Sequence, residues 1–384
     1  MGSFHFPVKI ISGEGCLSIL ADEVNRLGAQ RPLIVTDPGI VAAGIVDKVI
    51  GPLKIKNILY KLFDGVEPDP QMRHVVKAAE AVKKENHDLI IALGGGSSID
   101  AAKAASILAV NDVDLRDLQG PRDAYPAEPL PIITVPTTAG SGSEVSSAAV
   151  IVDEEKKFKM YFKSPQIFSK VAFLDAQAVA GIPRHIAAAT GADALTHAVE
   201  SFFNPNRTFV TEAASLRATE IVFSNLHHFI HNTRDLKSAQ DMLYASSLAG
   251  IAMTTAGLGL VHALAHPLGV KGHIPHALAC ALLLAPVLRF NRPAVSDRFM
   301  ELALCIDRKI PAGMTGQKGI DDRVIQAVEE LLSEIGIPKR LSDISATLDD
   351  VAGVVDESYD SFLSRVNPRP VSKADIESII QKII

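Results

Sequence analysis

The stretch that decides the fold is GGGSSIDAAKA (Gly94–Ala104), which directly follows the apolar run DLIIAL (Asp88–Leu93). A short, fully apolar run is typical of a strand that is buried on both faces of a parallel sheet. Glycines let the backbone approach a ligand closely, and the N–H groups that open a helix favour an anion. The stretch is neither a full GxGxxG, since Ile99 replaces the third glycine, nor a P-loop. Phosphate binding and a merely tight turn therefore both remain open.

The first half of the chain continues this alternation of strand and helix. Apolar, β-branched runs at 32–37 and 130–138 read as further strands, and helical patterns lie between them. Alternation of this kind predicts a parallel sheet covered on both faces. From about His185 onward the chain reads as one helix after another. We predict an α/β doubly wound dinucleotide-binding domain over 1–183 and an α-helical metal-binding catalytic domain over 184–384, with the ligand between them.

Composition narrows the class of protein. The chain has 384 residues, 47% of them hydrophobic and 21% charged, with a formal net charge of −6. This balance is ordinary for a soluble protein with a sizeable core, and nothing in it suggests binding to nucleic acid or to an anionic membrane. We expect no signal peptide and no apolar run long enough to span a bilayer. The three scattered cysteines form no CxxC pair, so we expect a reduced, cytoplasmic location.

Two other strand ends carry polar residues that suit a dinucleotide. VPTTAGSGSEVSS (Val135–Ser147) supplies hydroxyl and amide donors, and Asp37 ends the run PLIVTD. An acid at a strand end accepts hydrogen bonds from a ribose and repels a 2′-phosphate, which favours NAD. The alternative for Asp37 is a helix N-cap. In a standard Rossmann unit the acid follows the glycines, whereas Asp37 precedes them, so a variant topology is required.

The helical half contains a candidate metal site. Asp193 and His197 lie four residues apart, His262 and His266 repeat this spacing, and His276 follows. Side chains at i and i+4 share a helix face, and an acid with several imidazoles suits Fe²⁺ or Zn²⁺. Such histidines can also be ordinary core residues, but burying them unpaired would be costly. A structural zinc site would favour cysteine, and we expect no cysteine near this cluster.

Because these motifs occur together and in this order along the chain, the sequence resembles the iron-containing (group III) alcohol dehydrogenase family over nearly its whole length. The similarity lies in FHFPVKIISGEG, ALGGGSSIDAAKA, VPTTAGSGSEV, ATGADALTHAVES and GLVHALAHPLGVKGHIPHALACALLLAPV. It implies a dehydroquinate synthase-like fold and hydride transfer between NAD(H) and a small alcohol or aldehyde. The metal would polarise the alkoxide or carbonyl oxygen. It also implies a homodimer or higher homo-oligomer.

The resemblance assigns roles residue by residue. It implies that the metal, Fe²⁺ or Zn²⁺, is held by Asp193, His197, His262 and His276. It places His266 beside the metal as a proton relay. The cofactor positions that match the family are Gly95, Gly96, Ser97, Ser98, Thr137, Thr138, Ser146 and Lys159, with Asp37 selecting NAD over NADP.

One segment departs from the family's usual pattern. GVKGHIPHA places Lys271 and His273 on a loop between His266 and His276. The two residues could pair with an anionic group on the substrate, although a solvent-exposed lysine is the commoner case.

Two other functions compete with the dehydrogenase. A metal- and NAD-dependent lyase of the dehydroquinate synthase type would recycle NAD without net redox change. A non-catalytic nucleotide-binding protein would have lost metal ligands, whereas all four positions are intact here.

Overall fold

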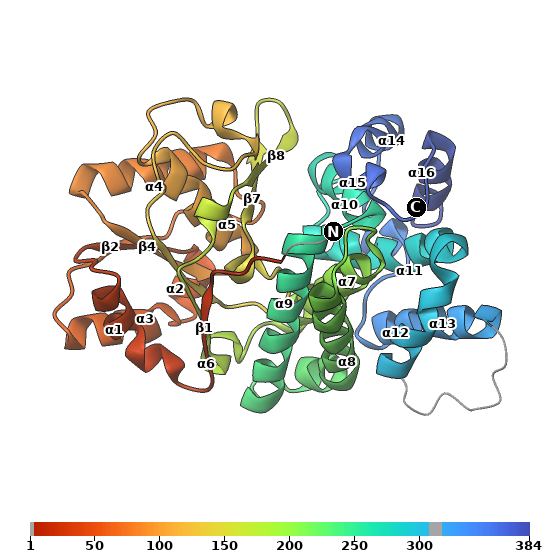
Figure 1. Ribbon diagram of the computed structural model, residues 1–384, viewed down its shortest axis with the longest axis horizontal. Coiled ribbons are helices and arrows are strands. Elements are labelled where there is room, and N and C mark those ends of the chain that lie inside the picture. Colours follow the sequence, from red (N-terminus) through yellow and green to blue (C-terminus); the bar gives the residue numbers. More distant parts are fainter. Residues whose placement is uncertain (1–3, 307–316) are drawn as a thin grey trace. The chain divides into compact units, whose positions relative to one another are not determined.

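The computed structural model describes residues 4–306 and 317–384 and is drawn in Figure 1. The chain divides into two compact units, one of which spans Phe6–Ile182 while the other is built on Pro183–Ile384. The predicted fold class is confirmed: a parallel sheet with helices occupies the first unit, and the second is mostly helical.

The first unit is organised by a six-stranded sheet in the order β1-β9-β6-β4-β2-β3. All of its strand pairs are parallel. In sheet order the strands are β1 (Lys9–Ser12), β9 (Val171–Leu174), β6 (Ile132–Pro136), β4 (Leu89–Gly94), β2 (Pro32–Val35) and β3 (Lys61–Phe63). The helices that connect them are α1 (Leu20–Arg26), α2 (Pro38–Ala42), α3 (Val46–Ile55), α4 (Met72–Glu85), α5 (Gly96–Leu108) and α6 (Ala176–Val179).

Both faces of this sheet are buried, which explains the unbroken apolar run of β4. Ile90 and Ala92 pack into one hydrophobic cluster with residues of α4 and α5. Leu89, Ile91 and Leu93 pack into a second cluster with residues of α1 and α3. Because successive side chains of a strand point to opposite faces, a strand covered on both sides must be apolar throughout.

The strand order brings Asp37 and the glycine loop together. The chain runs outward from β2 to β3, returns to β4, and then proceeds in the opposite direction through β6 and β9. The order of the sheet therefore reverses between β2 and β4, and ligands of doubly wound sheets bind at such a switch point. Asp37 follows β2 and Gly95 follows β4, so the two are spatial neighbours although the acid comes first in the sequence.

A small second sheet was not predicted from the sequence. It consists of β5 (Gly120–Pro121), β8 (Phe158–Lys163) and β7 (Ala148–Asp153), with β7 and β8 antiparallel. Strand β7 begins one residue after the polar loop Val135–Ser147 ends, so the sheet anchors the far end of that loop.

The second unit is built from helices, and its described residues contain no strand. Helices α7, α8 and α9 pack against one another, and α11 packs against both α7 and α10. The helices are α7 (Arg184–Phe203), α8 (Phe209–His231), α9 (Leu236–Ala256), α10 (Leu260–Lys271), α11 (His276–Val295), α12 (Phe299–Ile306), α13 (Gln317–Glu334), α14 (Val351–Asp360), α15 (Phe362–Arg365) and α16 (Lys373–Ile380).

One part of this unit corrects the expectation about membrane-length segments. The continuous helical stretch His276–Ile306 is long and apolar enough to cross a bilayer, and the bent pair α9 and α10 passes the same test together. The most apolar window of His276–Ile306 is 61% buried inside the protein. Since α11 also packs against α7, α10 and α13, we interpret the stretch as a core helix.

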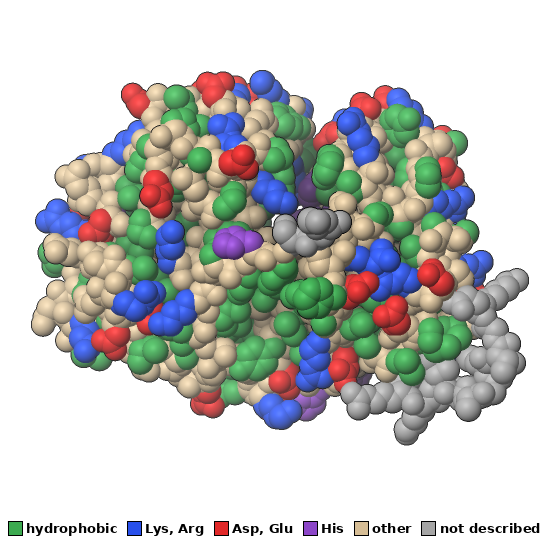
Figure 2. Space-filling model, viewed as in Figure 1, with side chains coloured by type: hydrophobic (Ala, Val, Ile, Leu, Met, Phe, Trp, Pro, Cys, Tyr) green, Lys and Arg blue, Asp and Glu red, His purple; other side chains and the backbone are tan. Residues whose placement is uncertain are grey.

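Charged side chains are interspersed on the protein surface. On the face drawn in Figure 2, basic and acidic side chains alternate without forming a large patch of one sign. This distribution agrees with the small net charge of −6. An electrostatic field that attracts a polyanion requires clustered positive charge, and this face has no large cluster of that kind.

Candidate metal centre and cofactor loops

The glycines of the first loop are required by its packing against the second loop. Gly94 has φ +152°, which disfavours any other residue. A Cβ on Gly96 would lie 2.9 Å from the Ser141 side chain, and one on Gly95 would lie 3.3 Å from that of Thr138. Gly95 is also the N-cap of α5 and provides no side-chain cap. The glycines are therefore required by the tight turn and by its packing, and the uncapped start of α5 is also suited to an anion.

Asp37 has the helix N-cap role that was considered as its alternative, and it also contacts the glycine loop. Its carboxylate accepts a hydrogen bond from the backbone N–H of Ile40 at 3.0 Å, so it is the N-cap of α2. Its other oxygen accepts a hydrogen bond from Ser98 Oγ at 3.2 Å. The acid is thus tied directly to the glycine loop, at the position where the adenosine ribose of a dinucleotide lies in doubly wound folds.

A buried lysine that sequence reasoning missed holds the second loop in shape. Lys103 on α5 is fully buried. Its ammonium donates to Ser143 O (2.6 Å), Ser146 O (2.7 Å), Ser146 Oγ (3.0 Å) and Ala148 O (3.0 Å). Burial lowers the pKa of Lys103 to about 8, while the carboxylates of Asp100 and Glu144 oppose this shift. The signal was present in the sequence as the one basic residue within the apolar helix SSIDAAKAASIL.

The other predicted cofactor residues lie in different settings. Thr137 is buried and Thr138 half-buried, both directly after β6. The Ser146 hydroxyl is engaged by Lys103, which gives it a structural task. Lys159 on β8 pairs with Asp69 at 2.8 Å. Gly96 and Ser97 form the first turn of α5, and both are half-buried.

The histidines of the helical unit converge on Asp193. Asp193 Oδ1 lies 3.7 Å from His197 Nε2 on the same helix and 4.0 Å from His262 Nε2 on α10. The rings of His197 and His262 stack with centroids 4.8 Å apart, and those of His262 and His276 are 5.4 Å apart. The i, i+4 spacing on α7 and the packing of α10 and α11 therefore bring all four predicted ligands into one cluster.

The expectation that no cysteine lies near this cluster was wrong. Cys280 Sγ is 3.7 Å from Nε2 of both His262 and His276. One ligand atom from each of Asp193, His262, His276 and Cys280 lies within 4.8 Å of all the others. Cys280 follows His276 by four residues on α11, so the spacing rule applied to the histidines also identifies the cysteine.

A second missed residue, Glu200, orients His262. Glu200 is buried on α7, and its two oxygens accept hydrogen bonds from Val261 N at 2.7 Å and His262 Nδ1 at 2.6 Å. Because Nδ1 carries the proton in this arrangement, Nε2 presents its lone pair to Asp193 and Cys280. Burial raises the pKa of Glu200 to about 7. The sequence signal was an acid three residues after His197 on an apolar helix.

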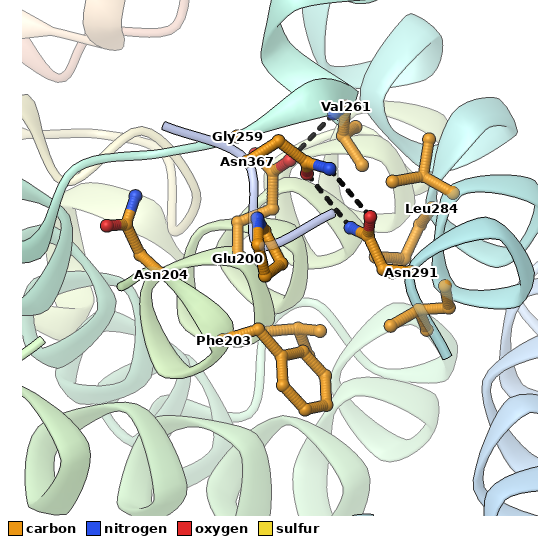
Figure 3. A pocket seen from close by; sticks show the side chains of 12 residues that line it. Glu200, Phe203, Asn204, Gly259, Val261, Leu284, Asn291 and Asn367 are labelled. Carbon is orange, nitrogen blue, oxygen red and sulfur yellow. Dashed lines mark hydrogen bonds between the residues drawn. The ribbon is translucent and has the colours of Figure 1, made fainter. Parts of the chain in front are cut away.

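Glu200 also lines a pocket, shown in Figure 3, whose lining includes two asparagines that are hydrogen-bonded to each other. Asn291 and Asn367 donate to each other's side-chain oxygens at 3.0 and 2.7 Å. Asn367 Oδ1 also accepts from Leu260 N, the first residue of α10. The start of the helix that carries His262 is therefore held from two sides.

The residues of the cluster fit a divalent cation. Within the described residues, the buried Asp193 Oδ1 accepts no hydrogen bond. A buried carboxylate oxygen without a donor is costly, and a metal ion would compensate it. Imidazole, carboxylate and thiolate together suit Zn²⁺ or Fe²⁺ better than Mg²⁺ or Ca²⁺.

The remaining predicted residues lie on or beside α10, and the expectation that Lys271 lies on a loop was wrong, because it is the last residue of that helix. The half-buried His266 has its ring 5.5 Å from that of His276 and 6.1 Å from that of His262, so it borders the cluster. Lys271 Nζ is 2.9 Å from Asp350 and 3.9 Å from Glu357, so its charge is already balanced within the chain. His273 is exposed, with φ +52°.

We predict that Glu200→Gln weakens metal binding about 10- to 100-fold, the usual cost of altering the partner of a ligating histidine. The amide keeps an oxygen for Nδ1–H but removes the negative charge. Chelator competition with Zn²⁺ measures the effect. Glu329→Gln, which alters a surface acid paired with Arg289, serves as the control. Equal zinc affinity of Glu200→Gln and the wild-type protein would show that Glu200 does not tune the site.

We predict that Lys103→Met weakens NADH binding by about tenfold or more, because about 1.4 kcal/mol is tenfold in affinity and one charged hydrogen bond contributes about 1.5–3 kcal/mol. Fluorescence titration with NADH measures this, with the exposed Lys84→Met as the control. Zinc affinity should stay unchanged, which also reports that the variant is folded. Wild-type NADH affinity in Lys103→Met would contradict the role of Lys103 in shaping the second loop.

Comparison with known proteins places this geometry in context. The family described as "Iron-containing alcohol dehydrogenase" matches residues 7–176, and "Fe-containing alcohol dehydrogenase family, C-terminal" matches residues 187–384. The lactaldehyde reductase of Escherichia coli (strain K12) is 34% identical over 366 residues, covering 95% of this chain and 94% of the relative.

Solved structures agree with this match. The crystal structure of a 1,3-propanediol oxidoreductase superposes with a TM-score of 0.96 at 32% identity, covering 100% of both chains. The sulfoacetaldehyde reductase of Bifidobacterium kashiwanohense in complex with NAD+ superposes with a TM-score of 0.88 at 27% identity, covering 100% of this chain and 98% of the relative. This chain therefore belongs to the iron-containing alcohol dehydrogenase family.

Proposed function

We propose that this protein is an NAD-dependent, metal-dependent oxidoreductase that transfers a hydride between NAD(H) and a small alcohol or aldehyde. The observation that carries the proposal is the convergence of the buried Asp193, His197 and His262 with the half-buried His276 in a chain of this family. In this proposal, residues 1–183 bind the dinucleotide and residues 184–384 hold the metal. Family membership favours this function over the lyase alternative.

The metal, Fe²⁺ or Zn²⁺, would supply Lewis acidity that polarises a carbonyl or alkoxide oxygen. Asp193, His197, His262 and His276 would hold it, and Glu200 fixes the ring of His262. His266, half-buried at the border of the cluster, would move the proton that accompanies hydride transfer, because imidazole gains and loses protons near neutral pH.

The two loops of the first unit would hold the dinucleotide. The backbone N–H groups at Gly95, Gly96, Ser97 and Ser98, where α5 begins, would bind the pyrophosphate. Asp37 would accept hydrogen bonds from the adenosine ribose and repel a 2′-phosphate. Thr137, Thr138, Ser146 and Lys159 would form the second side of the cofactor site, with Ser146 acting through the loop that Lys103 holds.

The substrate belongs to the class of small alcohols and aldehydes. The relatives named above are a lactaldehyde reductase, a 1,3-propanediol oxidoreductase and a sulfoacetaldehyde reductase, of which the last has an anionic substrate. For Lys271 to bind such an anion it would have to exchange its contacts with Asp350 and Glu357. The exposed His273 carries no such cost. We further propose a cytoplasmic enzyme that assembles as a homodimer or higher homo-oligomer.

We predict that removal of the metal with a chelator abolishes NADH oxidation and that reloading with Fe²⁺ or Zn²⁺ under anaerobic conditions restores it. A panel of neutral and anionic aldehydes, followed by NADH absorbance, measures the activity and shows whether charge is recognised. Activity that survives complete metal removal would contradict the proposal. Binding of metal and NADH without turnover of any aldehyde or alcohol would instead favour the lyase.

We predict that Asp37→Asn shifts cofactor preference toward NADPH. Asparagine keeps the acceptor that caps α2 but removes the charge that repels a 2′-phosphate. The ratio of kcat/KM for NADPH over NADH should rise by about tenfold or more, since two charges about 4 Å apart interact by about 4 kcal/mol near a protein surface. Asp47→Asn, on the exposed side of α3, is the control. An unchanged ratio would assign the selection to another residue.

A further inference from the structure

The group of candidate metal ligands contains a sulfur atom to which the family resemblance assigns no role. Cys280 is fully buried on α11, with its Sγ 3.7 Å from Nε2 of both His262 and His276. Asp193 completes a group whose ligand atoms all lie within 4.8 Å of one another. The side chain therefore lies inside the cluster and not merely beside it.

The distances match those between two ligands of one metal ion. With Zn–S about 2.3 Å and Zn–N about 2.0–2.1 Å, a tetrahedral site separates sulfur from nitrogen by about 3.6 Å. Both observed separations are 3.7 Å. Without a metal, the two contacts require S–H···N to one ring and N–H···S from the other, whereas a single metal ion accounts for both.

The orientation of His262 supports the same conclusion. Its Nδ1 is bonded to Glu200, so the lone pair of Nε2 points toward Cys280 and toward Asp193 Oδ1, 4.0 Å away. In the metal-free protein the thiol proton can lie between the sulfur and Nε2, and a bound cation would take the place of that proton. Sulfur, nitrogen and carboxylate oxygen then surround a single position for that cation.

We propose that Cys280 is a sulfur ligand of the metal at this centre in the substrate-free protein. On binding, the thiol releases its proton to solvent and the thiolate forms the bond to the metal, with no change in oxidation state. The inference rests on the metal site of the proposed function. A thiolate among imidazoles favours Zn²⁺ or Co²⁺ over harder cations, so Cys280 is also a determinant of metal selectivity.

Cobalt spectroscopy tests the proposal without reference to activity. The full-length protein is stripped with chelator and loaded anaerobically with one equivalent of Co²⁺. A thiolate-to-cobalt charge-transfer band in the near ultraviolet is expected for the wild-type protein. Cys280→Ser should lose this band while keeping the visible absorption of bound cobalt. Cys16→Ser and Cys305→Ser, which alter the two cysteines outside the cluster, should keep it.

The result that overturns the proposal is wild-type protein with bound cobalt, visible absorption and no charge-transfer band. Should Cys280→Ser fail to fold, X-ray absorption of the zinc-loaded wild type decides the matter. A sulfur neighbour at about 2.3 Å supports the ligand, and a shell of nitrogen and oxygen alone overturns it. A sulfur signal in a protein that turns over no alcohol or aldehyde would reject only the proposed function. Failure to bind cobalt or zinc at all would reject both.

Discussion

The two hydrogen bonds that Glu200 accepts at the start of α10 are the contacts on which the functional face of the helical unit depends. They join α7, which carries Asp193 and His197, to α10, which carries His262. The carboxylate sits in an apolar interior, where burial raises its pKa to about 7. A cation bound by His262 would favour the ionised form of Glu200. The ionised carboxylate in turn strengthens the hydrogen bonds that join α7 to α10.

The first unit uses a buried charge in the same way. Lys103 on α5 binds backbone oxygens of the second loop, and the glycines that precede α5 allow the two loops to touch. A buried ammonium is stable only when several acceptors surround it, so the loop must keep one conformation to satisfy the charge. In each unit a charged side chain inside the core therefore fixes the backbone that borders the ligand site.

The sequence predicted those features that depend on local spacing. The strand–turn–helix at Gly94 follows from an unbroken apolar run before three glycines, and the metal-site pairs on α7 and α10 follow from the i, i+4 spacing. It did not predict the β7–β8 sheet, because charged residues at 154–157 and 159 obscure the alternation of these strands. Lys103 and Glu200 each stand out as a charge in an apolar helix, but the backbone and the ring that they bind lie far along the chain, so no local pattern identifies those partners.

For Cys280, the family resemblance and the helical spacing rule give different sets of metal ligands. The resemblance identifies as ligands only the four residues that match the family's known positions. The i, i+4 rule identifies any donor on the same helix face, including a cysteine four residues after His276. The fold thus gathers donors of Asp193, His262, His276 and Cys280 within 4.8 Å of one another and adds His197 3.7 Å from Asp193, whereas a tetrahedral ion uses four. Which four it takes depends on the softness of the ion and not on the backbone. The metal content of this protein is therefore a property of its side-chain chemistry that the fold alone does not determine.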